Sequence, residues 1–331
     1  MKRNIALILS IAYGLGMAHA AEPIIPAMMS IAGGQFTMGN DEKPAASPAH
    51  EVTVKPFKLA KYEVTVSEFR RFVEATGYMA PEKCGQMAGK EWFDMIAGSW
   101  KSHTLTHNEF EPIVCIGAAG ADAYVQWLAR TTGKNYRLPT AAEWEYAARA
   151  GSRSKFFFGD DANKEAAQVC RYGNIADRSA EAAIKRDFDG LESKDHVGVA
   201  ACDDLADYAS VVGMFEPNAW GLHDTIGNVS EYVQDCGHKG YKGAPTDGSP
   251  WMDVAACKTR ELRGGNWHWP AFGSASRTDM SVDFIGALEG LRIALDGDEP
   301  ASKNAATREF EAALLKAQAD ERDRRASKKP L

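Results

Sequence analysis

Carboxylates and asparagines are concentrated in a stretch that is also rich in apolar residues, residues 217–235. Asp224 and Glu231 lie on either side of Gly227, a residue that permits a tight turn with exposed backbone carbonyls. The interleaved apolar residues indicate that these carboxylates are held inside the fold, where an unpaired charge is costly unless a cation or hydrogen bonds compensate it. Carboxylate and carbonyl oxygens are the ligands that Ca²⁺ takes. Taken by itself, however, the stretch is explained more simply as a polar loop with an apolar edge.

Residues 1–20 have the pattern of a secretory signal peptide. Lys2 and Arg3 precede an apolar run over residues 5–17, and an Ala-x-Ala site predicts cleavage after Ala20. The apolar run is shorter than the ~20 residues that span a membrane, which argues against an anchor. We therefore expect an exported protein, located in a bacterial periplasm, that has no membrane span after cleavage.

Cysteines are the other residues that could do chemistry here, and they are Cys84, Cys115, Cys170, Cys202, Cys236 and Cys257. An even number of cysteines in an exported chain favours structural disulfides over free thiols, but the sequence leaves their pairing open. No pair has the Cys-x-x-Cys spacing, so neither a zinc site nor a thioredoxin-like redox motif is supported. The net charge of −7 gives no basic surface for nucleic acid.

The elements that must position these residues are few and short. Alternating apolar residues predict strands over residues 31–39 and 50–59, and an apolar face predicts a helix over residues 118–130. Residues 78–111 and 152–215 show little periodicity and are expected to be irregular. The pattern predicts a compact α+β fold held together by aromatic cores, disulfides and ions.

Two capping boxes predict where further helices begin. Thr65 is followed three residues later by Glu68, and Thr140 is followed three residues later by Glu143. In each case apolar residues at helical spacing continue the pattern, and a glycine closely follows it.

The C-terminal residues 299–331 predict a helix, because residues 301–329 are rich in Ala, Glu, Arg and Lys and contain almost no Gly or Pro. Its apolar stripe consists of Phe310, Leu314 and Ala317. Glu321 and Arg325 form an i, i+4 pair. The stripe must be covered, either by the protein's own domain or by a partner, and the sequence does not decide between the two.

Five motifs in a fixed order make the chain resemble the sulfatase-modifying-factor family, whose fold is that of the formylglycine-generating enzymes. The motifs are Gly33-Gly-Gln-Phe-Thr-Met-Gly39, residues 136–149, residues 218–233, Arg263-Gly-Gly-Asn-Trp267 and Gly290-Leu-Arg292. The resemblance implies one domain over residues 21–298, a variant of the C-type lectin fold with low regular secondary structure, followed by the helical tail.

The resemblance also implies two structural calcium sites. The family's second site maps onto the side chains of Asp224 and Glu231 and the carbonyls of Gly227 and Val229. Its first site maps onto Asn174, Ile175, Asp204 and the carbonyl of Ala206, although the family's Asp-Gly-aromatic motif reads Asp204-Leu205-Ala206 here. Both sets supply the hard oxygen donors that Ca²⁺ requires.

The copper site of the family is not reproduced. Formylglycine-generating enzymes hold copper through two cysteines, and the corresponding positions here are Trp269 and Ser274. Because thiolates are the ligands that Cu(I) prefers, no copper and no formylglycine formation are expected, and no catalytic residue is assigned. A residual pocket is predicted instead, formed by Trp267, His268, Trp269, Ser274 and Arg277, with plain aromatic packing as the alternative.

A second metal motif is weaker. His103, His107 and Glu109 have the spacing of an iron site found in ergothioneine-type sulfoxide synthases. That spacing aligns ligands only on a helix, whereas this Thr-rich segment is β-prone, so a polar surface segment is the favoured interpretation.

Two function classes follow from the resemblance. In the first, the chain is a catalytically inactive regulator that binds a periplasmic or inner-membrane protein, as do TagR-like regulators upstream of the membrane threonine kinase that switches on type VI secretion. In the second, it is a cysteine-independent periplasmic tailoring enzyme of the PvdO type, which acts in siderophore maturation. The missing cysteines and the added helix favour the regulator.

Overall fold

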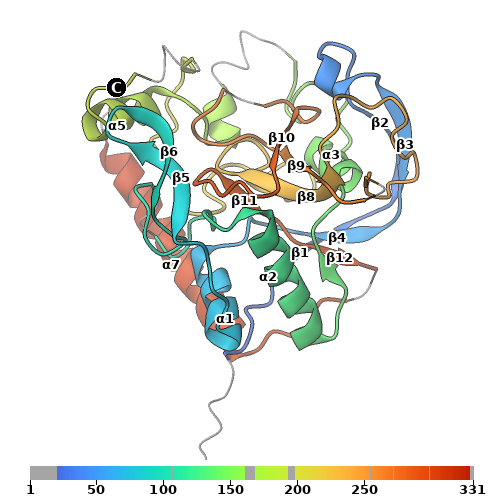
Figure 1. Cartoon of the computed structure of the whole chain (residues 1–331), viewed down its shortest axis with the longest axis horizontal. Helices are drawn as coiled ribbons and strands as arrows, with labels where there is room; N and C mark the ends of the chain where they lie inside the picture. The colour runs from blue at the N-terminus through green and yellow to red at the C-terminus, as the bar shows by residue number, and fades with distance from the viewer. Residues whose placement is uncertain are drawn as a thin grey trace, which may run out of the picture.

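The computed structural model describes residues 21–105, 108–160, 168–192, 198–253, 255–270, 272–297 and 299–328. Two four-stranded sheets form its centre (Figure 1). The first has the order β1-β4-β12-β7, and the second has the order β10-β9-β8-β11. The bounds of the first are β1 Met28–Ile31, β4 Phe57–Ala60, β12 Ala294–Asp296 and β7 Tyr136–Arg137. The bounds of the second are β10 Arg277–Ser281, β9 Thr259–Arg263, β8 Ser230–Cys236 and β11 Glu289–Leu291.

Two hairpins lie beside these sheets. They are formed by β2 Gly34–Met38 with β3 His50–Val54, and by β5 Lys83–Ala88 with β6 Glu91–Ala97. The expected strand over residues 50–59 is in fact two strands, because Pro56 interrupts it between β3 and β4. The expectation of an irregular segment over residues 78–111 was wrong, since β5 and β6 lie within it.

The described helices are α1 Val66–Thr76, α2 Gly117–Thr132, α3 Ala141–Arg149, α5 Arg178–Asp187 and α7 Ala305–Ser327, with a short 3₁₀ turn, η1, at Pro44–Ala46. Of these, α1 and α3 begin where the two capping boxes predict. Both capping boxes are complete, with the Thr65 and Thr140 hydroxyls accepting from the backbone and the N3 glutamates accepting in return. The α5 helix was not expected, and Asp177 caps its N-terminus.

The C-terminal helix packs on the protein's own domain, and this resolves the alternative that the sequence left open. Phe310, Leu314 and Ala317 lie against Tyr62, Phe110, Val211, Val212 and Met214. Asn304 caps α7 and its amide also donates to Pro23 O at 2.7 Å, so the start of the described chain lies beside the N-terminus of α7. In Figure 1 α7 runs along one side of the molecule, past α1 and towards α5.

Candidate functional site

A buried group of carboxylates lies where the turn before β8 meets the end of β11. Glu231 accepts hydrogen bonds from Arg292 at 2.7 Å and 3.0 Å and from Trp144 Nε1 at 2.6 Å. The parallel pairing of β11 with β8 aligns Gly290 with Glu231, which places Arg292 beside the carboxylate. Asp224 and Glu63 complete the group, and all of these side chains are buried.

The turn itself requires glycine at position 227. Gly227 has φ of 77°, and a β carbon there would come within 1.7 Å of Asn174 O. Asp224 and Asn228 on either side also have positive φ, at 58° and 61°. The close backbone approach therefore fixes the carboxylates of Asp224 and Glu231 on opposite sides of the turn.

The buried charges do not balance among the residues in contact. Three carboxylates, Glu63, Asp224 and Glu231, surround the guanidinium of Arg292. Burial, followed by repulsion from Asp224 and Glu231, raises the pKa of Glu63 well above its ordinary value. Burial also raises the pKa of Asp224 to about 6. Excess buried negative charge of this kind favours either protonation of a carboxylate or binding of an additional cation.

The residues of the predicted second calcium site leave only part of their donor set available for a cation. Asp224 Oδ2 accepts from Gly213 N at 2.7 Å, whereas its Oδ1 is buried without a hydrogen-bond partner. Both carboxylate oxygens of Glu231 are already engaged by Arg292 and Trp144. The donor set therefore fits a cation best at Asp224, with the carbonyls of Gly227 and Val229 as the further predicted ligands.

The predicted first site forms around Asp204 and Asn174. Asp204 accepts from Ala206 N at 2.7 Å and from Ile175 N at 3.3 Å. The amide of Asn174 donates to Tyr208 O at 2.8 Å, whereas its Oδ1 is buried without a hydrogen-bond partner. That unsatisfied oxygen is what a hard cation would use, so this donor set also fits calcium.

Asp177 belongs to the same group, although sequence reasoning did not include it. Asp177 and Asp204 lie close enough to share a cation, and Asp204 N donates to the Asp177 carboxylate. Burial, followed by repulsion from Asp177, raises the pKa of Asp204 well above its ordinary value, and burial raises that of Asp177 to about 6. Cys170 is also near but is held in a disulfide with Cys202. The position of Asp177 as a helix N-cap was the available signal.

The two predicted calcium stretches form one continuous polar layer. Asn174 and Gly227 form a parallel β-bridge, and Asn228 N donates to Asn174 O at 2.8 Å. The Asn174 amide also reaches Asn228 Oδ1 at 3.2 Å, and the Asn228 amide donates to Glu63 at 2.8 Å. The two predicted sites are therefore connected by directly hydrogen-bonded residues.

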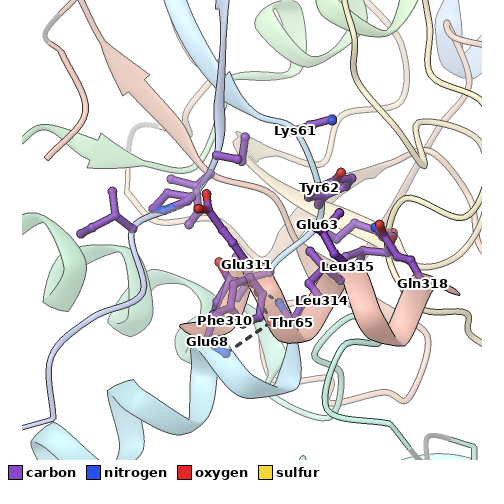
Figure 2. Close-up of a pocket in the computed structure, with 17 residues that line it drawn as sticks. Lys61, Tyr62, Glu63, Thr65, Glu68, Phe310, Glu311, Leu314, Leu315 and Gln318 are labelled. Atoms are coloured by element: carbon purple, nitrogen blue, oxygen red, sulfur yellow. Dashed lines mark hydrogen bonds between the residues drawn. The ribbon is translucent and has the colours of Figure 1, made fainter. Parts of the chain in front are cut away.

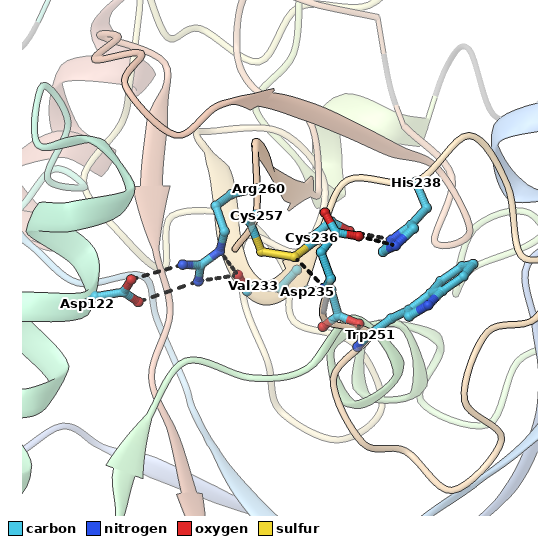
Figure 3. Close-up of a disulfide and its surroundings, with 9 residues drawn as sticks. Asp122, Val233, Asp235, Cys236, His238, Trp251, Cys257 and Arg260 are labelled. Carbon is cyan, nitrogen blue, oxygen red and sulfur yellow. Dashed lines mark hydrogen bonds and ion pairs between the residues drawn. A yellow bond between two sulfur atoms is a disulfide. The ribbon is translucent and has the colours of Figure 1, made fainter. Parts of the chain in front are cut away.

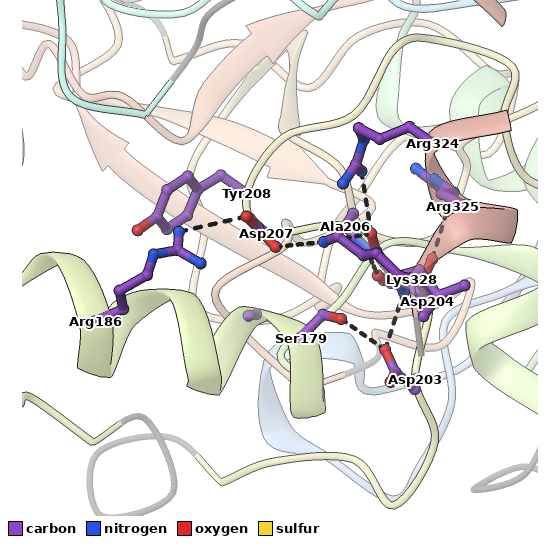
Figure 4. Close-up of polar contacts among 12 residues, drawn as sticks. Ser179, Arg186, Asp203, Asp204, Ala206, Asp207, Tyr208, Arg324, Arg325 and Lys328 are labelled. Carbon is purple, nitrogen blue, oxygen red and sulfur yellow. Dashed lines mark hydrogen bonds and ion pairs between the residues drawn. The ribbon is translucent and has the colours of Figure 1, made fainter. Parts of the chain in front are cut away.

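The C-terminal helix contributes to this layer as well (Figure 4). Arg325 donates to Asp204 O at 3.1 Å and to the Ser210 hydroxyl, and its Nε donates to Glu321 at 2.8 Å. The predicted Glu321–Arg325 pair is thus confirmed. Burial raises the pKa values of Asp204 and Asp224, and the Arg325 guanidinium opposes part of that rise. Sequence reasoning identified the pair but not its position beside a predicted metal site.

A cavity of about 250 Å³ lies beneath α7, against the segment that joins β4 to α1 (Figure 2). Glu63 and Glu68 line it together with apolar side chains such as Phe310 and Leu314. Burial raises the pKa of Glu68 to about 7. The cavity separates α7 from the buried carboxylates on this side of the molecule.

A larger cavity of about 410 Å³ lies beside Trp269. His268, Trp269 and Arg277 line it, as predicted. The prediction was wrong for Trp267 and Ser274, which do not line it. Trp267 is fully buried against the ring of Tyr208 because it faces the core. Ser274 is buried, and its backbone N–H donates to Lys155 O at 2.8 Å.

Glu289 is the lining residue that sequence reasoning missed. Its side chain is only 4% exposed, its Oε2 has no hydrogen-bond partner, and burial raises its pKa to about 7. The signal in the sequence was an acidic residue inside the otherwise apolar run Ala287-Leu-Glu-Gly-Leu291. A carboxyl of this kind can accept or donate a proton near neutral pH.

All six cysteines are oxidised in pairs. The disulfides are Cys84–Cys115, Cys170–Cys202 and Cys236–Cys257. No cysteine of the chain is free, so no thiolate is present at or near Trp269 and Ser274. The residues at this place therefore do not fit a Cu(I) centre.

The His-x-x-x-His motif is not assembled by the described part of the chain. His107 lies outside the described residues, and Glu109 is paired with Arg70 at 3.1 Å at the surface.

Among the helices that the structure describes, none is long and apolar enough to cross a membrane.

The chain matches one family model and several known proteins. The sequence profile of the Sulfatase-modifying factor enzyme 1-like domain matches residues 16–296. A formylglycine-generating enzyme of Mus musculus is 27% identical over 252 residues, which cover 66% of this chain and 61% of the relative, less than two thirds of its length. The inactive C-alpha-formylglycine-generating enzyme 2 of Mus musculus is 29% identical, and the match covers 79% of this chain and 80% of that one.

Two further similarities bear on function. The serine/threonine-protein kinase pkn1 of Chlamydia pneumoniae is 26% identical over 249 residues, which cover 74% of this chain and 34% of the kinase. The solved structure of PvdO from Pseudomonas aeruginosa is 32% identical with a TM-score of 0.65, and the match covers 82% of this chain and 94% of that one. By its profile, its relatives and its fold, this chain belongs to the sulfatase-modifying-factor family, the family of the formylglycine-generating enzymes.

Proposed function

We propose that this protein is a periplasmic member of the family that does not make formylglycine and acts as a regulatory binding partner of another exported or membrane protein. The observation that carries the proposal is the state of the cysteines. All six are used in disulfides, and the sequence resemblance places Trp269 and Ser274 where the family has its two copper-binding cysteines. Three disulfides are also typical of proteins that work in an oxidising compartment.

The partner we propose is the periplasmic part of a membrane serine/threonine kinase that controls type VI secretion by phosphorylation. Two similarities support a regulatory role of this kind. One relative is named inactive, and another is named a serine/threonine kinase, with the similar segment covering 34% of it. The similar proteins therefore include one that is named an inactive formylglycine-generating enzyme and one that is named a serine/threonine kinase.

Capture experiments test this proposal. The full chain, immobilised and exposed to periplasmic and membrane extracts, should retain the kinase, which mass spectrometry would identify. The mouse formylglycine-generating enzyme serves as a bait of the same fold. In parallel, the protein should leave a sulfatase peptide unmodified when copper and oxygen are supplied. Recovery of the kinase on both baits, or conversion of the peptide, would contradict the proposal.

We further propose that the protein binds Ca²⁺ structurally, at one or both of the predicted sites. The buried oxygens of Asp224 and Asn174 that lack partners support it. A ligand that binds the folded state at 100 times its Kd adds about 2.7 kcal/mol of stability. Calcium should therefore raise Tm relative to EGTA, and Asp224→Asn should reduce that increase, whereas Mg²⁺ should have little effect. An identical Tm with calcium and with EGTA would exclude a structural role.

A second candidate function is a cysteine-independent tailoring enzyme of the PvdO type, in siderophore maturation. The cavity beside Trp269 favours it, because the buried Glu289 could act there as an acid or base. The 32% identity to PvdO adds support. The test is to express this chain in a Pseudomonas aeruginosa strain that lacks PvdO. Restored siderophore maturation would favour the enzyme, and an unchanged defect would favour the regulator.

A further inference from the structure

The cavity of about 410 Å³ contains a single carboxylate among the described residues that line it, that of Glu289. This side chain lies in β11 and is almost completely buried. Its Oε2 has no hydrogen-bond partner, although a buried carboxylate oxygen normally has one. Glu289, whose Oε2 is buried and unsatisfied, therefore lines a cavity large enough for a small molecule.

The positive side chain that also lines the cavity is already engaged elsewhere. Arg277 forms an ion pair with Glu261, donates to Ala45 O at 3.3 Å and lies 4.6 Å from the centre of the Tyr241 ring. The amide of Asn266 is likewise occupied, because it donates to the Ser230 hydroxyl at 3.0 Å. Neither group therefore neutralises Glu289.

Aromatic and sulfur-containing side chains form much of the wall. These residues are Phe93, Trp269, Phe272, Met280 and Phe284. The Trp269 side chain is 39% exposed, so the cavity is open to solvent on that side. Aromatic faces attract cations through their quadrupoles, and the attraction is greatest where water is excluded.

We propose that this cavity is a binding site for a small organic cation, a primary amine or a quaternary ammonium group carried on an apolar body. The ammonium group pairs with Glu289, and the aromatic walls contact the methylene or methyl groups next to the nitrogen. A neutral ligand of the same shape would leave the carboxylate unpaired, which is costly in a buried site. The inference goes beyond the proposed regulatory role, because it holds whether the occupied pocket regulates or catalyses.

Gly286 provides the space that the carboxylate needs. A β carbon at position 286 would come within 2.0 Å of Glu289 Oε2. Gly286→Ala should therefore displace the carboxylate without removing its charge, and this gives a second variant that acts on the same oxygen.

Calorimetric titration with matched ligands tests the proposal. Benzylamine and benzyltrimethylammonium are the cationic probes, and benzyl alcohol is the neutral probe of similar shape. The wild-type protein should bind both cations saturably and bind the alcohol at least about tenfold more weakly. Glu289→Gln should weaken cation binding at least about tenfold and leave the alcohol unaffected, because it keeps the shape of the side chain but removes the charge.

Glu68→Gln is the matched control, since Glu68 is also a buried carboxyl but lines a different cavity. It should leave cation binding unchanged, whereas Gly286→Ala should weaken it in a protein with an unchanged circular dichroism spectrum. Equal binding of amine and alcohol, wild-type affinity in Glu289→Gln, or no cation binding at millimolar concentration would overturn the proposal. These outcomes do not depend on whether a kinase is captured, so each proposal can fail separately.

Discussion

Arg292 is in direct contact with the buried Glu231 carboxylate and connects three parts of the chain. Its guanidinium donates to Glu231, to Ala60 O at 3.1 Å and to His223 O at 2.9 Å. Removing one partner of a buried ion pair leaves the other charge uncompensated, which costs about 3–5 kcal/mol. We therefore expect Arg292→Met to lower the free energy of unfolding by about that amount, as measured by urea denaturation in calcium-free buffer.

The matched control for this change is Arg186→Met. Arg186 also pairs with a carboxylate, that of Asp187, but its side chain lies at the surface. Surface ion pairs contribute little because water and salt screen them. The urea midpoint of this variant should stay at the wild-type value. If both variants unfolded at the same urea concentration, the buried charges would not be what Arg292 stabilises.

Glu68 provides a prediction about pH. Burial raises the pKa of this carboxyl from its ordinary 4.5 to about 7. The folded state then binds the proton more tightly than the unfolded state does, so protonation favours folding. The contribution is fully present below about pH 4.5 and is lost as the pH rises through about 7. We expect Glu68→Gln to reduce the loss of stability between pH 5 and pH 8 by about 1–3 kcal/mol.

Thermal or urea unfolding at the two pH values measures this effect. Glu74→Gln on the same helix is the control, because Glu74 is exposed. That variant should keep the pH dependence of the wild-type protein. A Glu68→Gln protein with unchanged pH dependence would show that the Glu68 carboxyl titrates near its ordinary pKa in the folded state.

At the scale of elements, α7 offers two adjacent leucines in opposite environments. Leu314 is 5% exposed and packs on Val211 and Val212, whereas Leu315 is 66% exposed. Truncating a buried leucine costs about 2–5 kcal/mol. Leu314→Ala should therefore lower the free energy of unfolding by about 2–4 kcal/mol, and Leu315→Ala should change it by less than about 0.5 kcal/mol.

Urea denaturation of the two variants makes this comparison directly. Equal effects of the two substitutions would mean that α7 is not docked on the domain in solution, and its apolar stripe would then be available to a partner. The docked arrangement also places Arg325 beside Asp204, so calcium affinity and helix docking are expected to change together in Leu314→Ala.

For the whole molecule, three disulfides close loops with sequence separations of 31, 32 and 21 residues. Disulfides over loops of this length contribute about 2–4 kcal/mol each, mainly by restricting the unfolded chain. We expect peptide mapping without reduction to recover these three linkages and no others. Reduction should lower Tm, and any other linkage, or a free thiol, would contradict the fold described here.

The surroundings of Cys236–Cys257 show how the disulfides are supported (Figure 3). The His238 ring stacks on Trp251 with centroids 3.7 Å apart and pairs with Asp253 at 3.3 Å. Arg260, next to this disulfide in the figure, donates to Asp122 at 2.9 Å and so links β9 to α2. This bridge therefore lies within a network that joins several elements.

Local patterns in the sequence determined much of the fold. The capping boxes at Thr65 and Thr140, the helix around residues 118–130 and the apolar stripe of α7 depend on side chains a few residues apart. The ordered motifs identified the family, and the even number of cysteines indicated disulfides. These features are visible in sequence because the interactions that create them are local, or because family members share the motifs.

Only the tertiary structure decided which distant residues meet. It paired the cysteines, joined Asn174 to Gly227, and placed Arg325 beside Asp204. It also turned Trp267 and Ser274 away from the cavity and brought Glu289 into it. The physical reason is that the burial and charge environment of each group depend on contacts between segments far apart in the chain, and no periodicity or spacing encodes those contacts.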